Sequence, residues 1–465
     1  MNLKKYIGNR AFYKSLLAVM LPILVQNGIT NFISLLDNVM VGQVGTEQMS
    51  GVSIVNQLLF VFYLCIFGAI SGAGLFSAQF FGKGDHEGVR HTFRFKLYSS
   101  LVLYALAMGI FLALGEPLIE LYLHEGGETG DIALTMRYAK EYLAISLIGL
   151  LPYTVTQIYA GTLRETGHTV PPMLAGILGV LVNLSLNYVL IFGKLGAPTL
   201  GVEGAAIATV IARFAEGIAL ILWTHAHPQK CEFIKGVYRS WRVPSALMKQ
   251  ILRTGTPLLL NETVWAAGQA VLLQCYSVRG IAVVSAMNIT NTIFNTFSVL
   301  FMAVGSAVAI LLGHQLGAGR RQQAREDATK MIAFSLLMGC LTAGLVAICA
   351  SFFPNLYNTT DEVRRLATQL TLVAALTAPL HAYLHSTYFT IRSGGKTLIT
   401  FLFDSGYVWA VSVVIAFTLS NFTAIPAVTV YLICQLADLL KALLGTLLVR
   451  SGTWANDITK IPKHG

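Results

Sequence analysis

The chain has 465 residues, of which 55% are hydrophobic and only 12% are charged, and its formal net charge is +10. Soluble domains carry about 25% charged residues, so this composition excludes an ordinary soluble protein and indicates one that crosses a membrane many times. The positive charge does not indicate a nucleic-acid partner, because membrane proteins gather Lys and Arg in their cytoplasmic loops.

Apolar runs of about twenty residues, the length that spans a bilayer, predict twelve transmembrane helices. They lie near residues 14–38, 50–80, 93–115, 138–162, 170–193, 201–225, 250–278, 281–312, 328–353, 362–391, 397–420 and 424–449. A charged stretch at 226–249 reads as a cytoplasmic linker between an N-terminal lobe (1–225) and a C-terminal lobe (250–465). The prediction is an all-α polytopic membrane protein with six helices in each lobe.

The sequences of the two lobes resemble one another, which indicates an internal repeat. Six pairs of like residues recur at a common separation of 235 positions: Pro22 and Pro257, Gly45 and Gly280, Asn56 and Asn291, Gly82 and Gly317, Gly84 and Gly319, and Arg90 and Arg325. Farther on, LRETGHT and IRSGGKT match at a separation of 228. Because six helices are an even number, we expect both lobes to keep one orientation, related by a pseudo-two-fold axis along the membrane normal around a central cleft.

The distribution of basic residues predicts the orientation. With both termini placed in the cytoplasm, the cytoplasmic segments hold 24 Lys and Arg residues and the outer loops hold 6. Cytoplasmic loops are the ones that carry the excess of Lys and Arg. The sequence therefore predicts a multi-pass protein of the cell membrane with both termini inside.

Two charged pairs lie within predicted helices. Arg213 and Glu216 are three residues apart, and so are Asp438 and Lys441 on the corresponding helix of the second lobe. This spacing places both members on one helix face, so we expect two intrahelical ion pairs.

A polar group is predicted inside the first lobe. Asp37 ends the first apolar run and has no charged neighbour, while Asn183 and Asn187 share a helix face as an i, i+4 pair. With a rise of about 1.5 Å per residue, these three and Thr209 reach a similar depth. Carboxylate, amide and hydroxyl oxygens suit a sodium ion or a proton relay. The alternative is that the amides and the hydroxyl only join helices.

The second lobe also carries polar residues at membrane depth. They are candidates for substrate contact: Glu262, Asn288, Asn291, His381, His385 and Asp404. The spacing of the two histidines would suit a metal, but no further ligand is apparent, so no metal is predicted. For Asp404, a hydrogen bond that joins helices is an equal alternative.

Several segments together resemble the multidrug and toxic compound extrusion (MATE) family. They are LLDNVMVGQVG, SAQFFGKGD, LRETGHTVPP, NLSLNYVLIFG, GVEGAAIATVIAR and GHQLGAGR, in one order from about residue 12 to 454. Members of that family are V-shaped, two-lobed antiporters that export amphipathic, often cationic compounds. The resemblance puts the aspartate of the first helix on Asp37 and further cation ligands on Asn183, Asn187, Ala205 and Thr209.

The chain also departs from the family pattern. One branch has an aspartate in place of Asn187, so its two-carboxylate proton scheme does not carry over. Another branch binds sodium through acids on helices 7 and 10. Glu262 lies near the first of these positions and His381 replaces the second, which leaves that sodium site incomplete.

We therefore expect a cation-coupled antiporter that exports organic cations by alternating access, driven by protons or sodium. It would act as a monomer in the bilayer, without a cofactor. The alternative within the superfamily is a flippase for lipid-linked saccharides. A membrane-embedded enzyme is disfavoured, because no HExxH or GxSxG signature is present.

Overall fold

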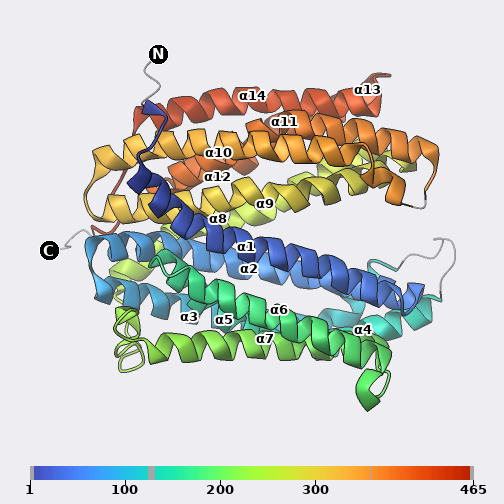
Figure 1. The fold of residues 1–465 in the computed structure, drawn as a ribbon, viewed down its shortest axis with the longest axis horizontal. Helices are drawn as coiled ribbons and strands as arrows, with labels where there is room; N and C mark the ends of the chain where they lie inside the picture. The colour runs from blue at the N-terminus through green and yellow to red at the C-terminus, as the bar shows by residue number, and fades with distance from the viewer. Residues whose placement is uncertain (1–4, 124–130, 358, 461–465) are drawn as a thin grey trace. The chain divides into compact units, whose positions relative to one another are not determined.

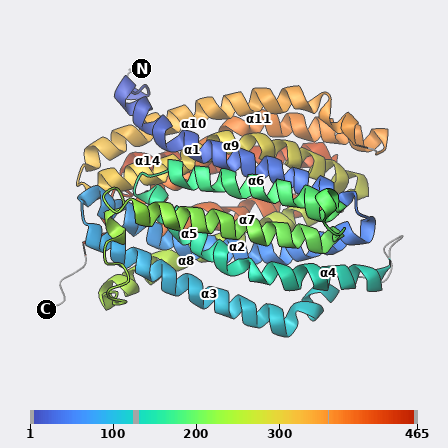
Figure 2. The same cartoon turned by 60° about the horizontal axis from the view of Figure 1, so that its bottom comes forward.

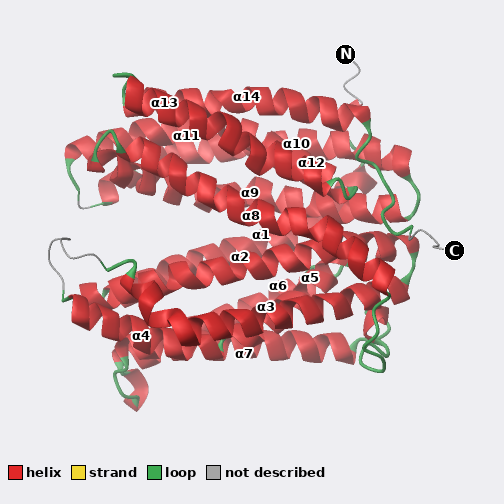
Figure 3. Ribbon diagram, turned by 180° about the vertical axis from the view of Figure 1, so that it is seen from behind, coloured by secondary structure: helices red, strands yellow, loops and turns green. Residues whose placement is uncertain are grey.

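The computed structural model describes residues 5–123, 131–357 and 359–460, and no strand occurs in this part of the chain (Figure 1, Figure 3). The first helices are α1 (Arg10–Gly42), α2 (Thr46–Lys83), α3 (His86–Glu120), α4 (Ile132–Ile148), α5 (Leu150–Glu165), α6 (Val170–Phe192) and α7 (Gly201–Ala226). The later ones are α8 (Ser245–Ser277), α9 (Ile281–Gly317), α10 (Arg321–Ala350), α11 (Asp361–Ser393), α12 (Thr397–Phe401), α13 (Val413–Phe422) and α14 (Ala427–Ser451). Two π-helical turns, η5 (Leu402–Gly406) and η6 (Val408–Ser412), join α12 to α13.

The described helices account for twelve membrane crossings. Nine are long and apolar enough to span a bilayer, counting 397–422 as one, and α4 and α5 together form a tenth that is bent by 45°. The bend lies at Gly149, directly before a turn that contains Pro152, which has no N–H to donate. α8 and α11, of 33 residues each, are long enough for the remaining two crossings but are more polar than the other spans. The predicted twelve-helix membrane fold is confirmed.

The chain separates into two compact units. The C-terminal unit contains Met1–Leu24, Ala78–Asp85 and Lys249–Gly465, and the N-terminal unit contains Val25–Ser77 and His86–Met248. The start of α1 and the end of α2 therefore belong with the second half of the chain. The linker prediction at 226–249 corresponds to the segment between α7 and α8, which contains the short helix η3 (Glu232–Ile234).

Within the C-terminal unit, α11 packs against α9, α10 and α14 (Figure 1, Figure 2). Leu16 and Met20 from the start of α1 belong to the same buried cluster as Val304 of α9 and Leu384 of α11. Within the N-terminal unit, α6 packs on α7, and α7 also contacts α4 and α5. Apolar side chains also cover the outside of both units, as expected for helices that face lipid.

The repeated glycines share backbone conformations. Gly84 and Gly319 both have φ of 76°, and Gly167 and Gly395 have φ of 79° and 76°. These values lie in the left-handed region that glycine adopts without steric cost, and each glycine ends a turn between two helices. The shared geometry supports the predicted internal repeat.

The tail after α14 folds back onto the C-terminal unit. The amide nitrogen of Gln79 donates to the backbone oxygens of Ser393 and Asn456, both at 3.0 Å, and its oxygen accepts from the N–H of Ile458 at 2.8 Å. Trp454 is only 1% exposed. The tail thereby links the end of α2 to the end of α11.

Candidate functional site

In the N-terminal unit, α6 and α7 bring three of the predicted residues together. The amide of Asn187 donates to Oδ1 of Asn183 at 3.1 Å, and the amide of Asn183 donates to Oγ1 of Thr209 at 3.2 Å. Asn187 is 1% exposed. The two helices approach closely at Gly204 of α7, because glycine has no side chain. A Cβ at this position would lie 2.8 Å from the backbone of Leu190 in α6.

The remaining members of this predicted group contribute differently. Asp37 lies in α1, but its side chain falls outside the described part of the structure. Ala205 is buried in α7 and offers no side-chain oxygen. In the described residues, the predicted group is therefore a hydrogen-bonded chain of two amides and one hydroxyl. Neither of its two hydrogen bonds comes from a cationic side chain.

Cationic side chains of the N-terminal unit have partners elsewhere, as Lys96 and Arg213 show. Lys96 of α3 is fully buried, pairs with Glu165 at the end of α5 and donates to Oγ1 of Thr162 at 3.1 Å. Arg213 donates to the hydroxyl of Tyr63 at 2.7 Å. Arg213 and Glu216, predicted as an ion pair, interact electrostatically but are not among the described close ion pairs, because the guanidinium reaches Tyr63 of α2.

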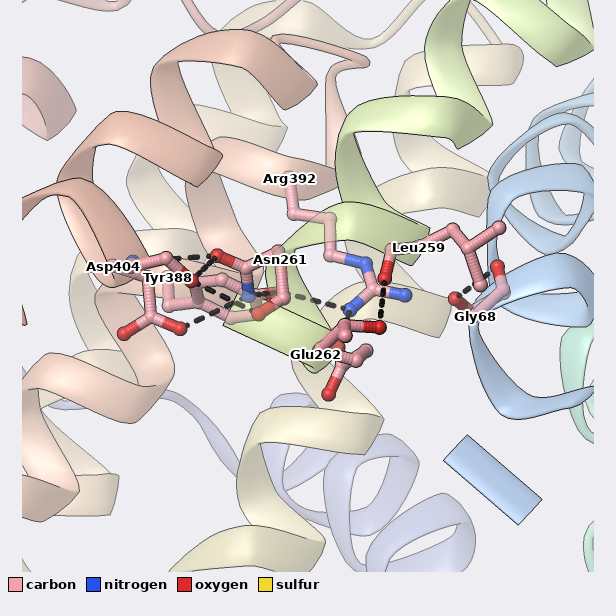
Figure 4. A network of polar contacts seen from close by, with 10 residues as sticks. Gly68, Leu259, Asn261, Glu262, Tyr388, Arg392 and Asp404 are labelled. Atoms are coloured by element: carbon pink, nitrogen blue, oxygen red, sulfur yellow. Dashed lines mark hydrogen bonds and ion pairs between the residues drawn. The ribbon is translucent and has the colours of Figure 1, made fainter. Parts of the chain in front are cut away.

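In the C-terminal unit, Asn261 of α8 is the centre of a polar network (Figure 4). Its amide nitrogen donates to Oδ2 of Asp404 at 3.1 Å and to the hydroxyl of Tyr388 at 3.3 Å. Its Oδ1 accepts from the backbone N–H of Ser405 at 3.3 Å and from the Ser405 hydroxyl at 2.7 Å. Both donors and both lone pairs of the amide are thus engaged, and Asn261 is only 2% exposed.

Asp404 lies in the π-helical turn η5 and pairs with a lysine of α14. Lys441 Nζ lies 2.9 Å from Oδ1 of Asp404. Asp438, the predicted partner three residues away, also interacts with Lys441 electrostatically, but the close ion pair is the one with Asp404. The wider winding of a π-helix changes which way its side chains point, and such turns are frequent at functional sites.

Glu262, next to Asn261 in sequence, faces a buried arginine. Arg392 of α11 lies with Nη1 3.9 Å from Oε1 of Glu262 and donates to the hydroxyl of Tyr388 at 3.2 Å. The guanidinium also lies 5.3 Å from the ring centroid of Phe389. Figure 4 shows Arg392 directed at Glu262 beside the Asn261 network.

The two histidines of α11 have separate partners. His381 Nε2 lies 2.9 Å from Oε1 of Gln435, whereas the ring of His385 packs 4.9 Å from that of Phe389. In the described part of the chain, no group of three or more His, Cys, Asp or Glu residues is arranged to hold a metal ion. Asn288 and Asn291 are exposed on α9 and lie outside these networks.

The sequence interpretation missed Asn261 and the role of Lys441. An asparagine directly before a glutamate, four residues after Pro257 in an apolar run, was the available signal for Asn261. The partner of Lys441 gave no comparable signal, because Asp404 is 37 residues away and meets it only through packing.

Comparison with known proteins gives consistent results. Residues 22–189 and 258–420 match the model of the MatE family. The chain is 26% identical over 454 residues to a probable multidrug resistance protein NorM of Thermotoga maritima, covering 95% of this chain and 93% of that protein. It is also 26% identical over 372 residues to the multidrug resistance protein MdtK of Edwardsiella ictaluri, covering 78% of each.

Solved structures resemble the fold at low sequence identity. A crystal structure of MATE in complex with MaD3S has a TM-score of 0.85 at 18% identity and covers 97% of both chains. A multidrug resistance MATE family transporter in an outward-facing conformation has a TM-score of 0.82 at 17% identity, covering 97% of this chain and 98% of that one.

Proposed function

Since the chain belongs to the MatE family and is a multidrug efflux antiporter, we propose that its coupling ion, a proton or sodium, binds in the N-terminal unit. The observation that carries this proposal is the buried chain of Asn187, Asn183 and Thr209. Buried amides and hydroxyls of this kind supply the neutral oxygen ligands that sodium prefers and that position a proton relay.

Asp37 supplies the charge of this proposed site. It is the acidic residue of α1, and its place in the chain agrees with the aspartate that the family resemblance assigns to coupling. A carboxylate at membrane depth is costly unless it binds a cation or a proton, so its occupancy changes the energy of the surrounding helices. Loading from outside would neutralise it and favour the helix rearrangement that releases substrate outward.

The basic-residue bias supports a position in the cell membrane with both termini in the cytoplasm. The exported compounds are proposed to be amphipathic organic cations, in line with the multidrug resistance relatives. One chain contains both halves of the repeat, so a monomer is sufficient for alternating access.

Transport by the purified protein in vesicles, with sodium and proton gradients imposed separately, tests the coupling. We expect one gradient to drive uptake of a fluorescent organic cation into inverted vesicles. Thr209→Val and Asn187→Leu should weaken that dependence at least 10-fold, because each removes an oxygen from the buried group. Thr256→Val, at an exposed position of α8, is the matched control and should behave as wild type. Equal coupling in all four proteins would contradict the proposed site.

A further inference from the structure

The polar network of the C-terminal unit pairs two of its carboxylates with its own cationic side chains. Two carboxylates, Glu262 and Asp404, each face one buried cation, Arg392 and Lys441 respectively. The two cationic side chains are only 4% and 9% exposed, whereas the carboxylates are 18% and 20% exposed. Lys441 also interacts electrostatically with Asp438, three residues before it on α14, so the group around the two pairs holds three carboxylates and two cations.

The ammonium of Lys441 is held on several sides. It lies 2.9 Å from Asp404 Oδ1, 5.3 Å from the ring centroid of Phe403 and 5.8 Å from that of Tyr407. Aromatic faces attract a cation through their negative charge density, and this attraction grows when water is excluded. Phe403 and Tyr407 flank Asp404 in the chain, so the turn that positions the carboxylate also positions both rings.

Both oxygens of Asp404 are already occupied. Oδ1 accepts from Lys441, and Oδ2 accepts from the amide of Asn261 at 3.1 Å. Asn261 in turn is fixed by Ser405 of the π-helical turn, because the backbone N–H of Ser405 donates to Oδ1 of Asn261. An incoming ion would have to share these oxygens with the two donors, and beside Lys441 it would meet the repulsion of a like charge.

We infer that Lys441 is a resident cation of the C-terminal unit: its ammonium occupies the position beside Asp404 that a coupling ion would otherwise take. Sodium or a proton at Asp404 would weaken the 2.9 Å ion pair with the ammonium and leave the more distant Asp438 as its other acidic neighbour. Breaking one half of a buried ion pair is strongly unfavourable. Asp404 therefore keeps its charge through the transport cycle, and coupling by an external ion does not use it.

The pair of Glu262 and Arg392 is looser than the pair of Asp404 and Lys441. Its distance of 3.9 Å from Arg392 exceeds that of a hydrogen bond, so its oxygens are less engaged than those of Asp404. The inference is accordingly restricted to the Asp404 and Lys441 pair. The inference rests on the proposed coupling function. It adds that the Asp404 and Lys441 pair does not bind the coupling ion.

The test measures cation binding to the purified full-length chain instead of transport. Melting temperatures are compared in sodium chloride and in choline chloride at equal ionic strength. The variants are Lys441→Met, which keeps the length of the side chain and removes its charge, Lys441→Arg, which keeps the charge, and the double variant Asp404→Asn with Lys441→Met, which removes both charges.

If Lys441 is a resident cation, Lys441→Met gains a saturable stabilisation by sodium, on the order of 5 °C beyond that of wild type. Lys441→Arg and the double variant should show the wild-type difference between the two salts. If Lys441→Met folds only in sodium, a higher yield of folded protein in sodium chloride than in choline chloride supports the inference in the same way.

Three results would overturn the inference. The first is a Lys441→Met protein with the wild-type salt response, and the second is one that folds in neither salt. The third is a double variant that has lost the cation response of wild type. A wild-type protein without any response to either ion would count against the proposed coupling site, while the difference between the variants would still decide the role of Lys441.

Discussion

Gly317 of α9 lies against the backbone of Gln79 in α2, so closely that a methyl group on Gly317 would overlap the Gln79 carbonyl oxygen. The reciprocal contact has the same form: a methyl group on Gly82 would overlap the backbone of His314. These four residues are related by the repeat, since 79 and 314, like 82 and 317, differ by 235. Equivalent helices of the two repeats thus cross at equivalent glycines, where the lack of a side chain permits backbone contact.

Replacement of Gly317 by alanine should force the ends of α2 and α9 apart. We expect a loss of about 1–3 kcal/mol in stability, the usual cost of overpacking. The melting temperature of the purified protein measures this. Gly344→Ala in α10 is the matched control, because a Cβ there meets nothing within 4 Å. If both variants melt alike, the glycine contact does not limit packing.

Asn261→Leu should destabilise the C-terminal unit more than its change in volume suggests. The substitution leaves the N–H of Ser405 and one oxygen of Asp404 without their donor or acceptor, and each such buried group costs about 1–3 kcal/mol. Thermal unfolding measures the effect. Asn421→Ala serves as control, since the Asn421 amide lies on an exposed part of α13 and donates only to the preceding turn. Equal stability of the two variants would show that the network contributes little.

The helices could be predicted from the sequence because each crossing must be both apolar and helical in a bilayer. Their ends were harder to place, since helices continue beyond the apolar run: the segment predicted at 93–115 extends over His86–Glu120. The break at Gly149 and the π-helical turns around Asp404 escaped prediction, because local winding leaves the hydrophobic content of a span unchanged.

Contacts within one helix were more predictable than contacts between helices. Asn183 and Asn187 could be paired from their i, i+4 spacing, and the structure joins them by a hydrogen bond. Spacing alone also paired Lys441 with Asp438, and these two do interact electrostatically, but it missed Asp404 of another segment, which forms the close ion pair. The partner of a buried charge depends on packing that the local sequence does not encode.

Accessibility of single cysteines tests the proposed orientation. Lys194 and Lys235 are both exposed, the first between α6 and α7 and the second between α7 and α8. In a background with Cys340→Ser, an impermeant thiol reagent should label Lys194→Cys in intact cells and Lys235→Cys only after permeabilisation. Burial raises the pKa of the native Cys231 thiol to about 11, so it stays protonated and inert at neutral pH. Labelling of Lys235→Cys in intact cells would reverse the topology.

Overexpression in an efflux-deficient host tests the class of substrate. We expect at least a 4-fold rise in the tolerated concentration of cationic aromatic compounds such as ethidium, and of fluoroquinolones. Such molecules offer the charge and the flat apolar surface that aromatic and acidic side chains recognise. The comparison needs a vector control and a measurement of protein in the membrane. Unchanged tolerance across a broad panel of dyes and drugs, with normal expression, would argue against organic cations as cargo.

The final prediction concerns Asp37, which ends the first apolar run and is placed by the proposal beside the Asn187, Asn183 and Thr209 chain. Asp37→Asn keeps the shape of the side chain and removes the charge that a proton or sodium would neutralise. Gradient-driven efflux should therefore fall at least 100-fold, while the protein still folds, inserts and melts within a few degrees of wild type. The appropriate control is Asp361→Asn, because Asp361 is exposed in the first turn of α11 and pairs only with Arg364. If Asp37 merely joins α1 to its neighbours, asparagine would preserve that hydrogen bond and most of the activity. Efflux by Asp37→Asn at the wild-type rate and expression level would exclude it as the coupling carboxylate.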